Sequence, residues 1–437
     1  MIICTKGIIV QERGVIMSVK FITFLGTGNY EACEYQLNNE HSRKTPYIQE
    51  ALIDLLLKQG ISIDEVNVFL TPEAKEKHWY GTGKLLEALK EQQNTGNFTI
   101  KERDISSKQN IETIWGLFEK MTSFMEKNDT IIFDITHSFR YQPMLALLAI
   151  HFARVTKNVQ IEGIFYGVYE SSVKEKIFPV IDLTTFVELQ DWITNVYAFT
   201  KTGRADMLTD WILEKDKLIR KKERGSTLDL KLVKNLADDW NELTAALQTN
   251  RSPHIPTKAK NALESIEGVK HVMLRPVFLP LNSLLTDVEE QIKPMTNDDL
   301  ILSGLAAIEW CAEHGLFQQA YTMAAELIVS AVCLKYGYDT KEKEERQKGS
   351  YLLTKALKLQ ENNNSILEEL TEDEQEVVMN LLRFSELLKV ANIIRDYRND
   401  INHAGWKPQT LNANVFKNNY DEWYPIYKKQ LLEFYFG

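Results

Sequence analysis

Three residue types that can cleave RNA lie close together near the C-terminus of the chain. Arg398, Asn399 and His403 fall within the six-residue segment RNDINH. Histidine transfers protons near neutral pH, and arginine can hold a phosphate with two hydrogen bonds. We interpret these three as catalytic residues that need no metal. The alternative is structural, because basic side chains at the C-terminal end of a helix also stabilise the helix dipole.

Two further segments could hold an anionic, nucleotide-like ligand. In the first, GTGNY, the glycines let a ligand approach the backbone and leave amides free for phosphate oxygens. The second, DITHSFR, places several hydrogen-bond donors beside a helix N-terminus. The ligand-binding candidates are Gly26, Thr27, Gly28, Asn29, Tyr30, Thr136, His137, Ser138 and Arg140. A glycine turn and a polar helix start without a ligand are the structural alternatives.

Two common nucleotide motifs are excluded. A dinucleotide fingerprint needs a third glycine at the position where this chain has Glu31. The segment Gly81-Thr-Gly83-Lys84 is no P-loop, because that motif needs glycine and a hydroxyl residue where this chain has His78 and Leu85.

The elements that position the two ligand segments alternate between strand and helix patterns. The strands are predicted at 20–25, 66–70, 98–100, 130–135, 160–169 and 177–183, and the helices at 46–60, 110–127 and 143–156. Thr45 should cap the first of these helices, and Ile111 should lie on the apolar face of the second. This alternation predicts a doubly wound, Rossmann-like parallel sheet with helices on both faces over residues 17–185. Each ligand segment follows a strand, and ligands of such sheets bind at the carboxyl ends of the strands.

Beyond residue 185 only helical patterns remain, so the fold class is α/β followed by all-α. We expect a helical connector at 186–295 and a C-terminal helical domain at 296–437 that carries RNDINH. Thr371 and Glu374 form a capping box, and the helix that starts there should end at Gly405 and Pro408. Residues 1–16 are interpreted as an N-terminal extension before Met17, or as an ordinary N-terminal arm.

The composition limits the classes of partner. The net charge of −10 argues against a general nucleic-acid coat but leaves a local basic site possible. The four cysteines form no CxxC pair, which argues against a zinc knuckle or a disulfide framework and suits a reducing cytoplasm. No apolar run reaches the roughly 18 residues that span a bilayer, so we expect no membrane contact.

The three motifs, in this order, resemble the ribonucleases of type III CRISPR systems that join a CARF sensor domain to a HEPN effector domain. FLGTGNY and DITHSFR look like the two ligand-facing loops of CARF, and RNDINH looks like the Arg-x4-His motif of HEPN. The stretch from Trp310 to Glu326 also looks like an early helix of that effector domain. The resemblance covers nearly the whole chain from Met17.

The resemblance implies a cytoplasmic antiviral endoribonuclease. Its activator would be a cyclic oligoadenylate, the tetra-adenylate or else the hexa-adenylate, bound across the axis of a homodimer or higher oligomer. Its substrate would be single-stranded RNA, cut without metal to 2′,3′-cyclic phosphate ends. Residues five apart point roughly 140° apart on one helix, which also favours a composite site made by two copies.

A rival interpretation belongs to another class. The chain could be a non-catalytic nucleotide sensor whose helical domain dimerises or binds a partner, and the acidic pI of about 5.5 favours this. In a third interpretation, the sensor domain slowly degrades its own ligand.

Overall fold

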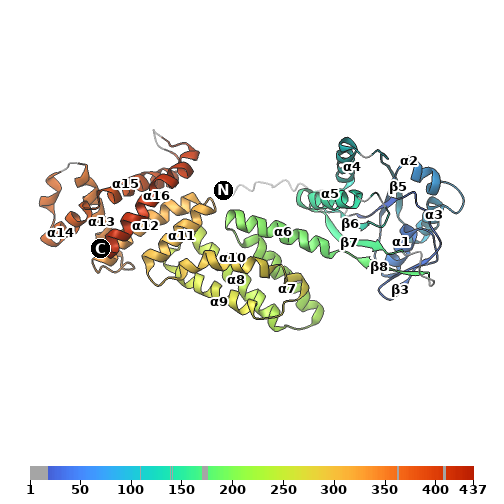
Figure 1. The fold of residues 1–437 in the computed structure, drawn as a ribbon, viewed down its shortest axis with the longest axis horizontal. Coiled ribbons are helices and arrows are strands. Elements are labelled where there is room, and N and C mark those ends of the chain that lie inside the picture. The colour runs from blue at the N-terminus through green and yellow to red at the C-terminus, as the bar shows by residue number, and fades with distance from the viewer. Residues whose placement is uncertain are drawn as a thin grey trace, which may run out of the picture. The chain divides into compact units, whose positions relative to one another are not determined.

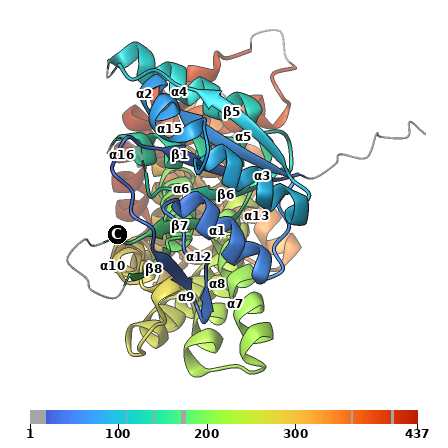
Figure 2. The ribbon, with the colours of Figure 1, turned by 90° about the vertical axis from the view of Figure 1, so that its right-hand side faces the viewer.

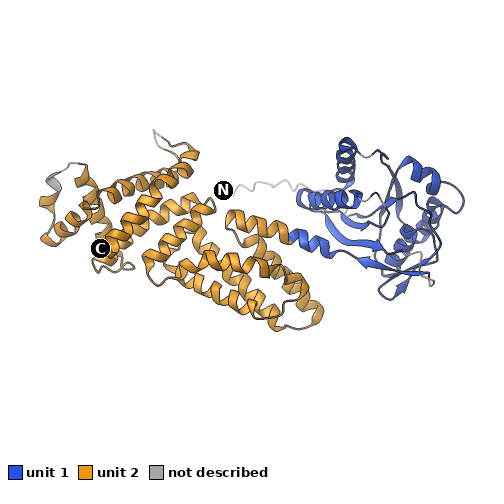
Figure 3. Ribbon diagram, in the orientation of Figure 1, with its two compact units in different colours: residues 1–191 blue, residues 192–437 orange. Residues whose placement is uncertain are grey.

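The computed structural model describes residues 18–108, 110–137, 139, 141–169, 176–361, 364–406 and 410–437. The chain forms two compact units, one extending to Asp191 and the other from Trp192 to Gly437 (Figure 3). The first unit is α/β and the second is helical, which confirms the predicted fold class. The expected extension at residues 1–16 lies outside the described residues.

The first unit is built on one eight-stranded sheet with the order β3-β2-β8-β7-β6-β1-β4-β5 (Figure 1). Its strands are β1 Val19–Leu25, β2 Glu34–Leu37, β3 Glu40–His41, β4 Glu65–Leu70, β5 Thr99–Asp104, β6 Thr130–Asp134, β7 Gln160–Gly167 and β8 Ile177–Asp182. The five strands from β7 to the β5 edge, β7-β6-β1-β4-β5, are all parallel.

The prediction of a wholly parallel sheet was wrong at one edge. Strand β8 pairs antiparallel with β7, and β3 pairs antiparallel with β2. Only nine residues separate Gly167 at the end of β7 from Ile177 at the start of β8. A parallel neighbour needs a crossover of about a dozen residues or more, so a direct return gives an antiparallel pair. Strands β2 and β3, of four and two residues, were not predicted.

Alternation along the strands divides the core of this unit into two layers. Phe21, Val66 and Val68 pack on one face with α1 and α3, whereas Ile22 and Phe133 pack on the other with α4 and α5. Figure 2 shows α1 and α3 in front of the sheet. The helices are α1 Ile48–Lys58, α2 Pro72–Ala74, the π-helix η1 Lys75–Trp79, α3 Leu85–Gly96, α4 Ile111–Phe124, α5 Tyr141–Lys157 and α6 Thr185–Thr202.

Two local predictions in this unit were wrong. Thr45 was expected to cap α1, but the cap position is Tyr47. Thr45 instead bridges to Cys33 and accepts a hydrogen bond from the Tyr47 amide. Ile111 was expected on the buried face of α4, yet its side chain is 73% exposed.

The second unit contains helices alone among its described residues. They are α7 Asp206–Glu223, α8 Leu228–Gln248, η2 Ser252–His254, α9 Ile255–Lys270, η3 Pro276–Phe278, α10 Leu281–Ile292, η4 Lys293–Thr296, α11 Leu300–Glu313, α12 Phe317–Lys335, α13 Lys343–Gln360, η5 Asn364–Glu369, α14 Glu372–Leu382, α15 Ser385–Asn402 and α16 Ala413–Phe436. One continuous apolar core runs through this unit, from Trp192 to Phe434. Helix α12 has the length and hydropathy of a membrane span, but more than half of that stretch is buried inside the unit.

Helix α16 is fixed to α12 by aromatic side chains whose polar ends form buried hydrogen bonds. The Tyr427 hydroxyl donates to the Ala324 carbonyl at 2.7 Å, and the Trp423 indole donates to the Tyr321 hydroxyl at 2.9 Å. These bonds satisfy the polar atoms of large buried rings. They also hold α12 in place beside α15, the helix that carries RNDINH.

The helix predicted to start at Thr371 is two helices. The Thr371–Glu374 capping box is present, but α14 ends at Leu382 and α15 starts at Ser385. Phe384 takes a non-helical backbone conformation between them. The apolar spacing continues across the break, so the sequence pattern alone did not reveal it. Gly405 follows α15 with a positive φ of 71°, as a helix stop requires, whereas Pro408 lies outside the described residues.

Candidate functional site

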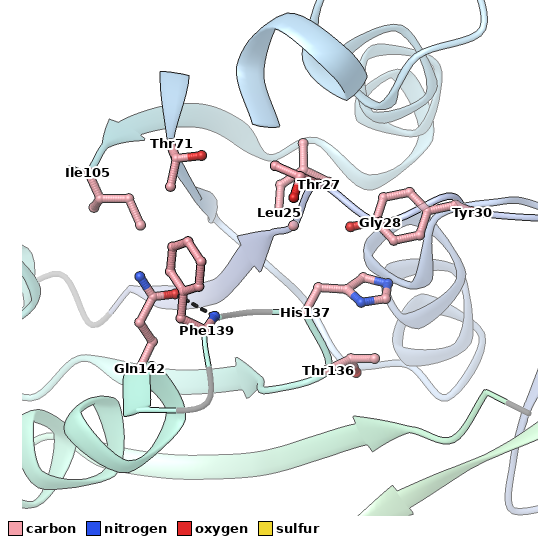
Figure 4. Close-up of a pocket in the computed structure, with 11 residues that line it drawn as sticks. Leu25, Thr27, Gly28, Tyr30, Thr71, Ile105, Thr136, His137, Phe139 and Gln142 are labelled. Atoms are coloured by element: carbon pink, nitrogen blue, oxygen red, sulfur yellow. Dashed lines mark hydrogen bonds between the residues drawn. The ribbon is translucent and has the colours of Figure 1, made fainter. Parts of the chain in front are cut away.

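A cavity of about 280 Å³ opens at the carboxyl ends of the parallel strands (Figure 4). Leu25 ends β1, while Thr71, Ile105 and Thr136 follow β4, β5 and β6. Strands β1 and β6 flank the point where the strand order reverses, and ligands of open α/β sheets bind in this crevice. The lining residues are Leu25, Gly26, Thr27, Gly28, Tyr30, Thr71, Ile105, Thr136, His137, Phe139 and Gln142.

The glycine loop is shaped by the close approach of Tyr30. A Cβ atom on Gly26 would lie 2.8 Å from the Tyr30 hydroxyl, and one on Gly28 would lie 3.4 Å from the Tyr30 ring. Any side chain at Gly26 would therefore push the tyrosine away. Glycine is required at this position because a side chain has too little space, and not because the backbone is left-handed.

The Tyr30 ring lies between two histidines. Its centroid is 4.6 Å from that of His137 and 4.6 Å from that of His78. His78 donates a hydrogen bond from Nε2 to the Gly28 carbonyl at 2.8 Å. Burial, with a smaller contribution from His78, lowers the pKa of His137 to about 4. Burial raises the pKa of Tyr30 to about 12, so both rings are neutral at pH 7.

A buried carboxylate organises the second loop. Asp134 accepts hydrogen bonds from Thr23 Oγ1 at 2.7 Å and from Thr136 Oγ1 at 2.6 Å. Burial raises its pKa, and these hydrogen bonds oppose the rise. The Thr136 hydroxyl also accepts from the Gly167 amide at 2.8 Å. Thr136 thus ties β6 to β7, and its hydroxyl is already engaged within the protein.

Most of the described ligand candidates line the cavity. They are Gly26, Thr27, Gly28, Tyr30, Thr136 and His137. Asn29 does not belong to this wall: its Oδ1 accepts a hydrogen bond from Lys77 Nζ at 2.8 Å. The same ammonium donates to the Thr27 carbonyl at 2.8 Å, so Lys77 braces the loop. The candidates Ser138 and Arg140 lie outside the described residues.

Sequence reasoning missed five residues of the cavity, and the first is Leu25, the last residue of β1. Thr71 and Ile105 follow strands β4 and β5, and their position after a strand was a usable signal. Phe139 belongs to the DITHSFR segment but was not chosen as a candidate. Gln142 lies in the first turn of α5, and no pattern in the sequence singled it out. Lys84 of the rejected Gly-Thr-Gly-Lys segment reaches the Glu76 carbonyl instead of this cavity.

The RNDINH segment forms the end of α15 in the second unit. Arg398 donates from Nη2 to Glu326 Oε1 of α12 at 3.0 Å and from Nη1 to Asn399 Oδ1 at 3.3 Å. The other carboxylate oxygen of Glu326 accepts from Arg346 Nη2 at 2.7 Å. Among the described residues, Arg398 Nε is buried without a hydrogen-bond partner. One carboxylate therefore orients two guanidinium groups.

His403 caps this helix, and its backbone amide donates to the Asn399 carbonyl at 2.9 Å. Its side chain is exposed. Asp400 is buried and accepts from the Leu411 amide at 3.1 Å, which fixes the chain after the helix. In the part of the chain that the structure describes, no three His, Cys, Asp or Glu side chains are grouped to hold a metal ion.

Comparison with known proteins identifies relatives of both units. Residues 20–170 match the model of the CARF domain of the CRISPR system endoribonuclease Csx1. Residues 188–297 match the second domain of the CRISPR-associated protein MJ1674. That protein, from Methanocaldococcus jannaschii, is 30% identical over 145 residues, which cover 32% of this chain. The match spans 23% of the relative, about a quarter of its length.

Among solved structures, Enterococcus italicus Csm6 bound to cyclic hexa-2′-fluoro-hexa-dAMP aligns over 96% of this chain and 94% of its own. The sequences are 13% identical and the TM-score is 0.33, which is too low to support an argument about this chain.

Proposed function

Since this chain is a CARF-containing protein of the type III CRISPR-associated group, we propose that it is an endoribonuclease switched on by cyclic oligoadenylate. The cavity at the carboxyl ends of β1 and β6 carries the proposal, because two predicted ligand loops meet there on a CARF fold. The activator binds in the first unit, and RNA is cleaved at Arg398, Asn399 and His403 in the second.

The cavity suits one part of a ring-shaped ligand. Its volume of about 280 Å³ is just below the range for small-molecule sites, roughly 300–1,000 Å³. A ring of four or six nucleotides is too large for it. Two copies of the cavity, brought together by a two-fold axis, would share such a ring. We favour the tetra-adenylate, with the hexa-adenylate as the alternative.

The face of α5 that follows the cavity supports this dimer. Met144, Leu148 and Val155 are 69%, 60% and 69% exposed and lie along one side of the helix. Trp115 on α4 is 67% exposed and contacts Phe118, which in turn contacts Phe152 of α5. Met144, Leu148 and Val155 form an exposed apolar stripe on α5, and such a stripe marks an interface. We assign it to a second copy of this chain, because α5 begins at the ligand cavity.

The proposed cleavage uses only side chains of the protein. His403 acts as general base or acid when the RNA 2′-hydroxyl attacks the adjacent phosphate. The phosphate then bonds to the 2′-oxygen and releases the 5′-oxygen of the next nucleotide, which takes up a proton. Arg398 stabilises the charge that develops on the phosphate, and Asn399 orients the Arg398 guanidinium. The products are a 2′,3′-cyclic phosphate and a 5′-hydroxyl end.

The test is a panel of cyclic oligoadenylates of defined size against a fluorescent single-stranded RNA reporter. We expect one ring size to bind the full-length protein and to start cleavage, and His403→Ala to bind it without cleaving. Binding without cleavage in the wild-type protein would favour the second candidate, a non-catalytic sensor. The observation that favours a non-catalytic sensor is the ion pair in which Glu326 already binds the Arg398 guanidinium.

A further inference from the structure

The ligand cavity has a neighbour in the same unit. This second cavity measures about 380 Å³ and lies beside the end of β5 and the start of α4. Ile105 and Gln142 line both cavities. The remaining wall of the second cavity includes Asp104, Ser106, Glu112, Thr113, Gly116, Leu117, Lys120 and Tyr141. The proposed function assigns no role to this space.

Gln142 presents a buried, unpaired donor between the two cavities. Its side chain is 2% exposed, and its Oε1 accepts the Phe139 amide at 3.2 Å (Figure 4). Its Nε2 makes no hydrogen bond with any residue that the structure describes. Leaving a buried amide donor unpaired destabilises the folded protein. A donor kept at that cost in the wall of a ligand cavity is suited to an acceptor on the ligand.

The Gln142 amide matches one edge of adenine. Adenine offers an acceptor at N7 and a donor at its N6 amine, and a glutamine amide pairs with both. Nε2 supplies the donor, and Oε1 retains a second lone pair besides the one that Phe139 uses. The Phe139 ring lines the same cavity, and its plane lies within 5° of the Tyr141 ring. Aromatic faces of this kind bind bases by stacking.

We propose that Gln142 recognises an adenine base of the activator and selects it over bases that carry an oxygen at position 6. This inference rests on the proposed function and adds to it a residue that determines base specificity. Guanine and hypoxanthine place the acceptor O6 where adenine has its N6 amine. That oxygen would face Oε1 of Gln142, so one hydrogen bond is lost and two acceptors repel each other.

The experiment measures binding of four probes to the full-length protein: the cyclic tetra- and hexa-adenylates and the same rings with inosine in place of adenosine. We expect the wild-type protein to prefer the adenosine ring by on the order of 10- to 100-fold, the scale of a bidentate base contact. Gln142→Met has similar length and no amide. It should weaken binding of the adenosine ring and lose most of this preference.

Gln92→Met is the matched control, because Gln92 is a buried glutamine on α3 whose Nε2 donates to the Glu50 carbonyl, away from the cavity. It should keep the wild-type preference. Equal binding of adenosine and inosine rings by the wild-type protein would overturn the inference, whether or not Gln142→Met folds. So would an undiminished preference in Gln142→Met. A wild-type protein that binds neither adenosine ring would instead refute the proposed function itself.

Discussion

Arg398 and Glu326 form an ion pair between α15 and α12, with Nη2 of the arginine 3.0 Å from Oε1 of the glutamate. Arg346 of α13 binds the other oxygen of the same carboxylate at 2.7 Å. The pair is partly exposed, so its contribution to stability is small, about 1 kcal/mol or less. Its effect is geometric, because it restricts the direction in which Arg398 presents its guanidinium.

Glu326→Gln should leave the fold intact and lower RNA cleavage. Glutamine keeps one acceptor but no charge, so it holds Arg398 and Arg346 less firmly, and a misplaced catalytic group costs rate. We expect the activator-stimulated rate to fall on the order of tenfold, measured with a fluorescent RNA reporter. Glu309→Gln, a carboxylate paired with Lys428, is the control and should cleave normally. Unchanged cleavage by Glu326→Gln would show that the carboxylate does not position Arg398.

Arg398→Ala and His403→Ala should each reduce cleavage by at least ~10²-fold, the scale of general acid–base catalysis. Binding of the activator, measured by calorimetry, should not change, because the ligand cavity belongs to the other unit. Arg395→Ala is the matched control, since Arg395 lies on the same helix and contacts Asn392 and Asp396. Near wild-type cleavage by His403→Ala would refute the catalytic assignment.

Cleavage should persist in excess EDTA. The catalytic groups that we assign are an imidazole, a guanidinium and an amide, and none of them requires a metal to act. The rate with activator should be the same in EDTA and in magnesium. Loss of activity in EDTA that magnesium restores would replace this mechanism with a metal-assisted one.

The stability of the first unit should fall as the pH is lowered from about 6.5 to 4. His137 has a folded-state pKa of about 4, so over this range its unfolded form binds a proton that its folded form does not. The loss from this residue is at most about 1.4 kcal/mol per pH unit. His137→Gln should weaken the dependence of the unfolding free energy on pH, measured by urea unfolding at several pH values. Burial also lowers the pKa of His78, so His78 should preserve part of this dependence. An unaltered pH dependence of stability in His137→Gln would contradict the burial argument.

Leu148→Glu should turn a dimer into a monomer. The substitution places a charge in the middle of the exposed stripe on α5, where a partner copy would have to desolvate it. Light scattering coupled to size exclusion should show the halved mass, and activator binding should weaken because a ring would meet a single cavity. Met273→Glu, at a 94% exposed methionine of the second unit, is the control. A dimer that persists in Leu148→Glu would move the interface elsewhere.

The sequence alone determined the class of each unit and the place of the ligand loops. Consecutive apolar residues such as Phe21 and Ile22 point to opposite faces of a strand. They therefore predict a sheet that is covered on both faces. Glycines and clustered donors that directly follow two such strands must lie at one edge of the sheet. These are local properties, and each can be read from residues that are neighbours in the chain.

The tertiary structure decided which side chains meet around those loops and in the second unit. Tyr30 meets His78 and His137 although they are 48 and 107 residues away in the chain, and Arg398 meets Glu326 at a separation of 72 residues. Asn29 is held by Lys77, and the cavity takes Phe139 from the loop before α5 and Gln142 from the first turn of α5. Such contacts depend on the order of strands in the sheet and on helix packing. No local pattern encodes them, because the partners meet only once the core has formed.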